Sequence, residues 1–138
     1  MKEENCIFCK IVAGEIPSET VYEDDWFKVI LDLGPASAGH MLILPKKHFA
    51  DVCELEEPYS SKLLPLAARL GRAAAKGLGC AGFNLVQNNG EAAGQTVRHF
   101  HLHVIPRYEN GPRMVDWEPG NPEKEQLAET AEKIRKEL

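Results

Sequence analysis

The chain has 138 residues, of which 43% are hydrophobic, and its formal net charge is −5. This length and apolar content fit one folded domain, and an acidic balance without a basic run argues against a protein that coats nucleic acid. The start is polar and no apolar run approaches the length of a membrane span, so we expect a cytoplasmic protein.

The first part of the chain predicts a short helix and three strands. Residues 6–13 predict a helix that Gly14 ends. Residues 21–23 and 26–31 predict strands, separated by a turn, and residues 32–39 predict a loop from their Gly, Pro and Ser content. Residues 40–45 are more continuously apolar, which favours a central strand.

The middle of the chain predicts the main helix over residues 57–78, because apolar residues recur there at spacings of three and four. Pro65 either kinks this helix or marks the first turn of a shorter one that follows a separate short helix. Residues 83–87 predict a fourth strand and residues 88–94 a polar loop.

The end of the chain is irregular after Pro106 and then predicts a second amphipathic helix. Trp117 is expected to be a packing anchor. Asn121 is the expected N-cap of the final helix and Pro122 its first residue. The apolar stripe of this helix consists of Leu127, Ala131, Ile134 and Leu138.

Three of the five histidines, His99, His101 and His103, stand at alternate positions. The residues between and after them are apolar, namely Phe100, Leu102 and Val104. Strict alternation predicts a strand with an apolar face toward the core and three imidazoles on the other face. Such a face could bind a metal, could perform nucleophilic and acid–base chemistry on a phosphate, or could be a polar surface without a function.

The four cysteines do not form the pattern of a secreted disulfide framework. Cys53 and Cys80 stand alone and are expected to be small buried residues. Cys6 and Cys9 form a C-x-x-C pair without a strand before it, which favours half of a zinc site over redox chemistry, provided that two more ligands exist.

The histidine row, residues 99–105, resembles the His-φ-His-φ-His-φ-φ signature of the histidine triad (HIT) family, where φ is an apolar residue. Residues 6–17, 32–48 and 88–107 are similar to further segments of bacterial family members, so the resemblance covers roughly residues 5–107. It implies one α+β domain over residues 1–138, with residues 108–138 as a tail and C-terminal helix. The fold would be a mostly antiparallel sheet of about five strands with one main helix, and many members are homodimers.

The resemblance also implies catalytic roles. His101 would attack the α-phosphorus of a nucleotide, oriented by a hydrogen bond from its ring to the backbone carbonyl of His99. An imidazole that is largely neutral at pH 7 has a lone pair available for this attack. His103 would donate to the phosphate, and His40 would support that group.

Further site residues are implied for the nucleotide and for zinc. The phosphate contacts would come from Asn88, Thr96 and the backbone N–H groups of Gly94 and Gln95. Asp32 would bind the ribose, with capping of the following loop as the alternative. The base would lie between apolar residues that could equally be core: Ile7, Phe8, Ile11, Ile30 and Leu33. A structural zinc would be held by Cys6, Cys9, His48 and His99, and no organic cofactor is expected.

The function implied is a nucleotidyl hydrolase or transferase that cleaves nucleoside phosphoramidates or dinucleoside polyphosphates through a nucleotidyl-histidine and releases a nucleoside monophosphate. The expected partners are a purine nucleotide and a second copy of the chain, with no nucleic-acid polymer and no membrane. Two alternatives stay open. One is a nucleotide-binding regulatory module with little turnover, and the other is a metal-dependent hydrolase with the histidine row as ligands.

Overall fold

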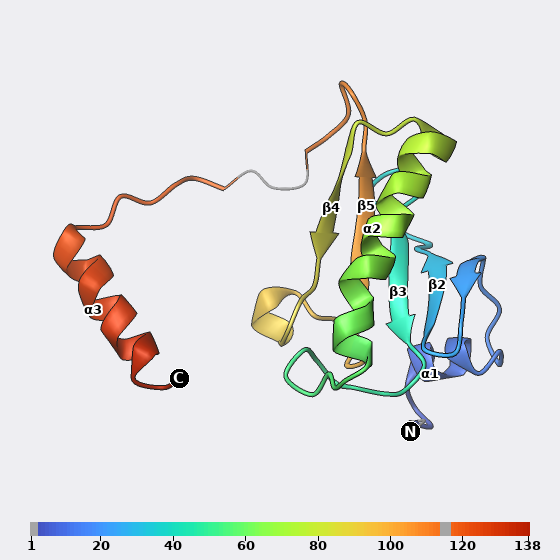
Figure 1. The fold of residues 1–138 in the computed structure, drawn as a ribbon, viewed down its shortest axis with the longest axis horizontal. Coiled ribbons are helices and arrows are strands. Elements are labelled where there is room, and N and C mark those ends of the chain that lie inside the picture. The colour runs from blue at the N-terminus through green and yellow to red at the C-terminus, as the bar shows by residue number, and fades with distance from the viewer. Residues whose placement is uncertain (1–2, 114–116) are drawn as a thin grey trace.

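A computed structural model describes residues 3–113 and 117–138 of the chain. Residues 114–116, within the stretch predicted to be irregular, lie outside the described residues. The elements form a five-stranded antiparallel sheet in the order β1-β2-β3-β5-β4 with three α-helices (Figure 1). In chain order they are α1 (Ile7–Val12), β1 (Thr20–Glu23), β2 (Phe27–Leu31), β3 (Met41–Pro45), α2 (Tyr59–Leu78), β4 (Gly82–Val86), the 3-10 turn η1 (Glu91–Ala93), β5 (Leu102–Arg107) and α3 (Lys124–Arg135).

The prediction of an α+β fold with five strands, a main helix and a C-terminal helix is confirmed. The continuously apolar run becomes β3, the middle strand of the sheet, and all five of its residues are buried. A strand covered on both faces needs apolar residues at every position, which explains why this run does not alternate.

Helix α2 covers one face of the sheet (Figure 1). The buried stripe of α2 includes Leu63, Leu66 and Leu70. It packs in one core cluster with Phe100, Leu102 and Val104. Gly71 faces β4 so closely that a Cβ atom there would lie 2.2 Å from the Phe83 ring. Pro65 lies inside the helix, on its exposed side. Helix α2 is therefore one element from Tyr59 to Leu78, and Pro65 does not mark the first turn of a shorter helix.

The opposite face of the sheet carries the short helix α1. Phe8 and Ile11 of α1 pack with Ile30, Leu42 and Leu44 in a second buried cluster. Residues opposite each other in an antiparallel pair point to the same face. Because Leu42 pairs with His103, the histidine side chain lies on the α1 face. His103 therefore lies on the predicted face. His99 and His101 precede β5, which begins at Leu102, so the strand starts later than the histidine row does.

Two predictions for the tail are wrong. Trp117 is 74% exposed, so it anchors nothing within its own chain. The N-cap of α3 is Glu123, which forms a reciprocal capping box with Gln126, and the helix begins after Pro122. A capping box satisfies two end N–H groups, whereas Asn121 would satisfy one. Within the part of the chain that the structure describes, no helix is long and apolar enough to cross a bilayer.

Candidate functional site

A pocket of about 440 Å³ opens on the α1 face beside the histidine row. Helix α1, strand β2 and the segment that leads into β5 supply its walls. Its lining residues are Ile7, Phe8, Ile11, Ile16, Pro17, Ser18, Ile30, Leu31, Asp32, Leu33, Leu42, Asn88, Gly94, Thr96, Val97, His101 and His103.

His101 is oriented by a backbone carbonyl. Its Nδ1 lies 2.8 Å from the carbonyl oxygen of His99, so Nδ1 carries the proton and donates. The neutral ring therefore keeps its lone pair on Nε2. Burial is the main cause that lowers the pKa of His101 below its usual 6.5. His101 is thus a neutral imidazole at pH 7 with a defined tautomer, on a residue that lines the pocket.

His103 is fixed by a second chain of hydrogen bonds. The backbone N–H of Ala36 donates to Nδ1 of His40 at 3.0 Å, so the proton of the neutral His40 ring is on Nε2. His40 Nε2 lies 2.8 Å from Nδ1 of His103 and donates to it. His103 is left with an N–H on Nε2, and burial lowers its pKa to about 4. His103 can therefore donate a hydrogen bond while neutral.

Asp32 caps the following loop and also lines the pocket. Its Oδ1 accepts from the N–H of Gly34 at 2.8 Å, which caps the loop after β2. Its Oδ2 lies 3.6 Å from Nε2 of His40, and the residue lines the pocket. The carboxylate thus holds the loop and also faces the ligand space.

The apolar walls belong to the pocket and to the core at once. Phe8, Ile11 and Ile30 line the pocket although each is at most 9% exposed. The Phe8 ring meets the His101 ring edge-on, with centroids 5.0 Å apart. Ile7 and Leu33 complete the wall from outside, since they are 48% and 95% exposed. A flat aromatic ligand fits such a slot between preformed apolar faces.

Three of the four residues predicted to hold phosphate line the pocket, namely Asn88, Gly94 and Thr96. Gln95 does not line it. Its backbone N–H donates to the carbonyl of Gly90, and the N–H of Gly94 donates to Glu91. Both N–H groups therefore close the η1 turn and are not available to a phosphate.

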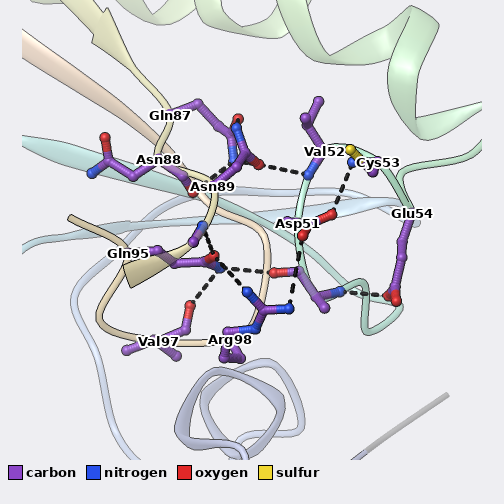
Figure 2. Close-up of polar contacts among 12 residues, drawn as sticks. Asp51, Val52, Cys53, Glu54, Gln87, Asn88, Asn89, Gln95, Val97 and Arg98 are labelled. Atoms are coloured by element: carbon purple, nitrogen blue, oxygen red, sulfur yellow. Dashed lines mark hydrogen bonds and ion pairs between the residues drawn. The ribbon is translucent and has the colours of Figure 1, made fainter. Parts of the chain in front are cut away.

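The side chain of Gln95 instead ties two loops together (Figure 2). Its amide nitrogen donates to the carbonyls of Ala50 and Val97 at 2.7 and 2.9 Å. Its oxygen accepts from the N–H of Gly90 at 2.8 Å and from Arg98 at 3.3 Å. The residue is 4% exposed. All four bonds of a buried amide are made, so Gln95 positions the loop that carries Asn88 and Gly94.

We expect the Gln95→Ala variant to lose about 1–3 kcal/mol of unfolding free energy, because buried partners of the amide are left unsatisfied. Amide hydrogen exchange over residues 88–96 should become faster, since the loop loses its support. Gln87→Ala is the matched control, because Gln87 bonds mainly to Asn89 outside the pocket. Equal effects from the two variants would contradict this role.

A second cluster lies at the start of α1. Nδ1 of His99 is 3.3 Å from Sγ of Cys6, 3.5 Å from Sγ of Cys9 and 3.2 Å from Nδ1 of His48. The four ligand atoms all lie within 4.8 Å of one another. Ligands of a tetrahedral zinc ion lie about 3.3–3.8 Å apart, given bonds of 2.0–2.3 Å. The cluster therefore has the dimensions of a closed Cys₂His₂ zinc site.

The hydrogen bonds of His99 support this assignment. Nε2 of His99 lies 3.1 Å from the carbonyl of Pro45 and donates to it, so the lone pair on Nδ1 faces the two thiols. This is the outer partner that a zinc-bound histidine usually has. The side chain is fully buried, and burial lowers the pKa of His99 to about 4.

Some contributors were missed by the sequence. Ala36 acts through its backbone N–H, which no side-chain pattern reveals. Ser18 lines the pocket, and its buried hydroxyl oxygen has no hydrogen-bond partner among the described residues. For Ala36, the Gly, Pro and Ser content of residues 32–39 predicted only that the chain turns there.

Fold and site together define an α+β protein in which His101 and His103, just before and within β5, face an apolar pocket beside a Cys/His cluster. The chain belongs to the HIT family, whose domain model, described as "HIT domain", matches residues 13–110.

Several named proteins are similar to the chain. "Protein hit" of Bacillus subtilis is 44% identical over 108 residues, which are 78% of this chain and 74% of that protein. "Adenylylsulfatase HINT3" of Arabidopsis thaliana is 42% identical over 78% of this chain and 54% of its own. "Adenosine 5'-monophosphoramidase hnt1" of Schizosaccharomyces pombe is 41% identical over 75% of this chain and 74% of its own.

Solved structures agree with the fold and with the cluster. A protein from Streptococcus mutans is 38% identical and superposes with a TM-score of 0.92 over 99% of this chain and 87% of that one. A structure described as a Zn-bound histidine triad family protein from Mycobacterium smegmatis has 38% identity, a TM-score of 0.76 and 84% coverage of both chains.

Proposed function

We propose that the chain is a nucleotidyl hydrolase or transferase that cleaves at the α-phosphate of nucleoside phosphoramidates or dinucleoside polyphosphates. One observation carries the proposal. The neutral ring of His101 is locked with its proton on Nδ1 by the His99 carbonyl, so its nucleophilic Nε2 is free on a residue that lines the pocket. The similarity to an adenylylsulfatase and an adenosine 5'-monophosphoramidase supports the same chemistry.

The reaction has two balanced steps. Nε2 of His101 attacks the α-phosphorus, and the bond from phosphorus to the leaving amine or phosphate breaks, with the electron pair going to the leaving group, which takes up a proton. Water then attacks the same phosphorus and gives up a proton to solvent, which balances the proton taken up by the leaving group, and the P–N bond to His101 breaks. The product is a nucleoside monophosphate, and the ring returns to its neutral tautomer.

Other pocket residues hold the substrate in this account. The Nε2–H of His103 donates to a phosphate oxygen, as do the side chains of Asn88 and Thr96. Asp32 accepts from the ribose hydroxyls through the oxygen that does not cap its loop. The base lies against Phe8 and Ile30, and its purine identity is part of the proposal.

A metal-dependent hydrolase with three histidine ligands finds little support in the geometry. The ring of His99 belongs to the Cys/His cluster, and Nδ1 of His103 is bonded to His40. His101 belongs to neither group of potential metal ligands found among residues 3–113 and 117–138. A binding module with little turnover would have the same pocket, so only activity separates it from an enzyme.

An assay of product release over a panel of adenylated and guanylated amines and dinucleoside polyphosphates tests the proposal. We expect release of the nucleoside monophosphate from at least one substrate class. Tight binding of the nucleotides without turnover of any panel member would establish the binding module instead.

Zinc, where bound, would be held by Cys6, Cys9, His48 and His99. All four positions of a tetrahedral ion would be filled by the protein, so zinc would have a structural role. It would connect α1, which forms a pocket wall, to the backbone of His99, whose carbonyl orients His101.

The pH dependence of kcat/KM is expected to follow the protonation of His101. The attack needs a neutral ring, and burial lowers the pKa of His101 below 6.5. Half of the His101 rings are therefore protonated only at a pH below 6.5, so the acid midpoint of kcat/KM should lie below 6.5. A rate profile with an acid midpoint above 6.5 would contradict this prediction.

A homodimer is a further prediction, and the β4 edge gives it a physical basis. β4 is an edge strand, and its Phe83 and Leu85 are 40% and 41% exposed. An unpaired edge with apolar side chains favours pairing with another strand. Sedimentation at micromolar concentration should give twice the chain mass of 15.4 kDa. A mass near 15.4 kDa would refute the prediction.

A further inference from the structure

The two thiols of the Cys/His cluster differ in their access to solvent. A surface cavity of about 440 Å³ is lined by Cys6 and His48 but by neither Cys9 nor His99. Cys6 is half-buried, whereas Cys9 is 3% exposed and His99 is fully buried. A small polar molecule that enters this cavity therefore reaches Cys6 before Cys9.

Cys6 and Cys9 are also placed for a disulfide. Cys6 is the N-cap of α1, and the N–H of Cys9 donates to Sγ of Cys6 at 3.4 Å. Residues three apart at the start of a helix have Cα atoms about 5 Å apart, given its rise and radius. Disulfides span roughly 4.4–6.8 Å between Cα atoms. The two sulfur atoms already lie within 4.8 Å of each other, so rotation of the side chains suffices to join them without unfolding of α1.

We propose that Cys6 and Cys9 are a redox-sensitive thiol pair, in which hydrogen peroxide oxidises Cys6 and Cys9 then closes a disulfide. First, the sulfur of Cys6 attacks a peroxide oxygen and the O–O bond breaks, which leaves a sulfenic acid and, with the thiol proton, one water. Next, the sulfur of Cys9 attacks the sulfur of Cys6, and the S–O bond breaks. Hydroxide leaves with the thiol proton of Cys9 as a second water. The two thiols lose two electrons, and the peroxide is reduced to two waters.

This oxidation is compatible with a zinc site, because the two states exclude each other within one molecule. Zinc binds cysteine as the thiolate, and a disulfide offers none. His48 and His99 alone do not complete a tetrahedral set. The reduced pair therefore retains zinc, and the oxidised pair releases it.

Oxidation separates α1 from the residues before β5. A helix of six residues is too short to be stable without tertiary contacts. Its other contacts with the sheet are the apolar packing of Phe8 and Ile11 and a bond from Lys28 to the carbonyl of Ile11. Phe8 and Ile11 also line the pocket beside His101, so this wall of the pocket becomes looser. The oxidation and its measurements are independent of the proposed reaction.

Differential alkylation and mass spectrometry of the unmodified protein test the pair. On titration with hydrogen peroxide, we expect the disulfide of Cys6 and Cys9 to form before Cys53 is oxidised, although Cys53 is exposed. Zinc, followed with a chelating dye, should be released in proportion, and a dithiol with added zinc should reverse both changes. The disulfide is detected by the loss of two hydrogens, so this result does not require zinc. Oxidation of Cys53 while Cys6 and Cys9 stay reduced would overturn the proposal.

Two variants in a background of Cys53→Ser and Cys80→Ser test the order of attack. With Cys9→Ser, the sulfenic acid of Cys6 has no thiol to react with, so we expect it to accumulate and to be trapped by dimedone. Cys6→Ser is the matched control, because it also removes one thiol of the cluster but leaves only the buried Cys9. Equal trapping in the two variants would overturn the assignment of Cys6 as the first thiol to react.

Hydrogen exchange before and after oxidation of the unmodified protein measures the effect on the pocket wall. We expect the amides of α1 to exchange faster in the disulfide form and those of α2 to be unchanged, because α2 packs on the other face of the sheet. Unchanged protection of α1 in the disulfide form would overturn the claim that oxidation loosens the wall.

Discussion

Replacement of His101 by alanine is expected to lower turnover by on the order of 10³-fold or more, since the attacking group is removed. The fold should survive, because the ring faces the pocket and the core contacts of this strand come from Phe100, Leu102 and Val104. Turnover of each substrate of the panel is the measurement, together with a thermal unfolding curve.

The neighbouring histidines provide the controls. His103→Ala and His40→Ala should cost less than His101→Ala, because these rings donate hydrogen bonds and do not attack. Activity of His101→Ala within tenfold of the unmodified protein would contradict the assignment of the nucleophile.

Removal of the zinc ligands is expected to have the largest effect on stability. Structural zinc can contribute ~10 kcal/mol or more in small domains, and less where a core exists, as it does here. Replacement of both Cys6 and Cys9 by serine should therefore release zinc and lower the Tm. Turnover should fall only in part, since neither the attacking Nε2 of His101 nor the bond from its Nδ1 to the His99 carbonyl involves a thiol.

Elemental analysis of protein purified without chelator is the direct check on zinc. The double variant Cys53→Ser with Cys80→Ser is the control, because neither thiol belongs to the cluster. We expect about one equivalent of zinc in the unmodified protein and in the control. Less than about a tenth of an equivalent in the unmodified protein, with Cys6 and Cys9 open to a thiol reagent, would refute the site.

Much of the fold and site could be predicted from local patterns. Alternation placed the rings of His101 and His103 on one face and Phe100 and Leu102 in the core, because side chains of a strand must alternate. The cluster of Cys6, Cys9, His48 and His99 was also expected, but through family resemblance, since spacing alone supplied only the two thiols.

The rest depends on contacts between distant segments. Gln95 stands between Gly94 and Thr96, which line the pocket, yet its side chain turns away to bond Ala50, which is 45 positions earlier. No sequence pattern within the loop distinguishes a residue that binds the substrate from one, such as Gln95, that connects two loops. Trp117 was expected to pack because large aromatic residues usually do. Its 74% exposure follows from the placement of the tail, which no local pattern reveals.

The most direct test of the central claim is mass spectrometry of a reaction stopped by acid-free quench within a single turnover. The account predicts a peptide containing His101 that is heavier by one nucleoside monophosphoryl group, and no such peptide from His101→Ala. Product formation at the normal rate without any adduct, or an adduct on another residue that His101→Ala retains, would contradict it.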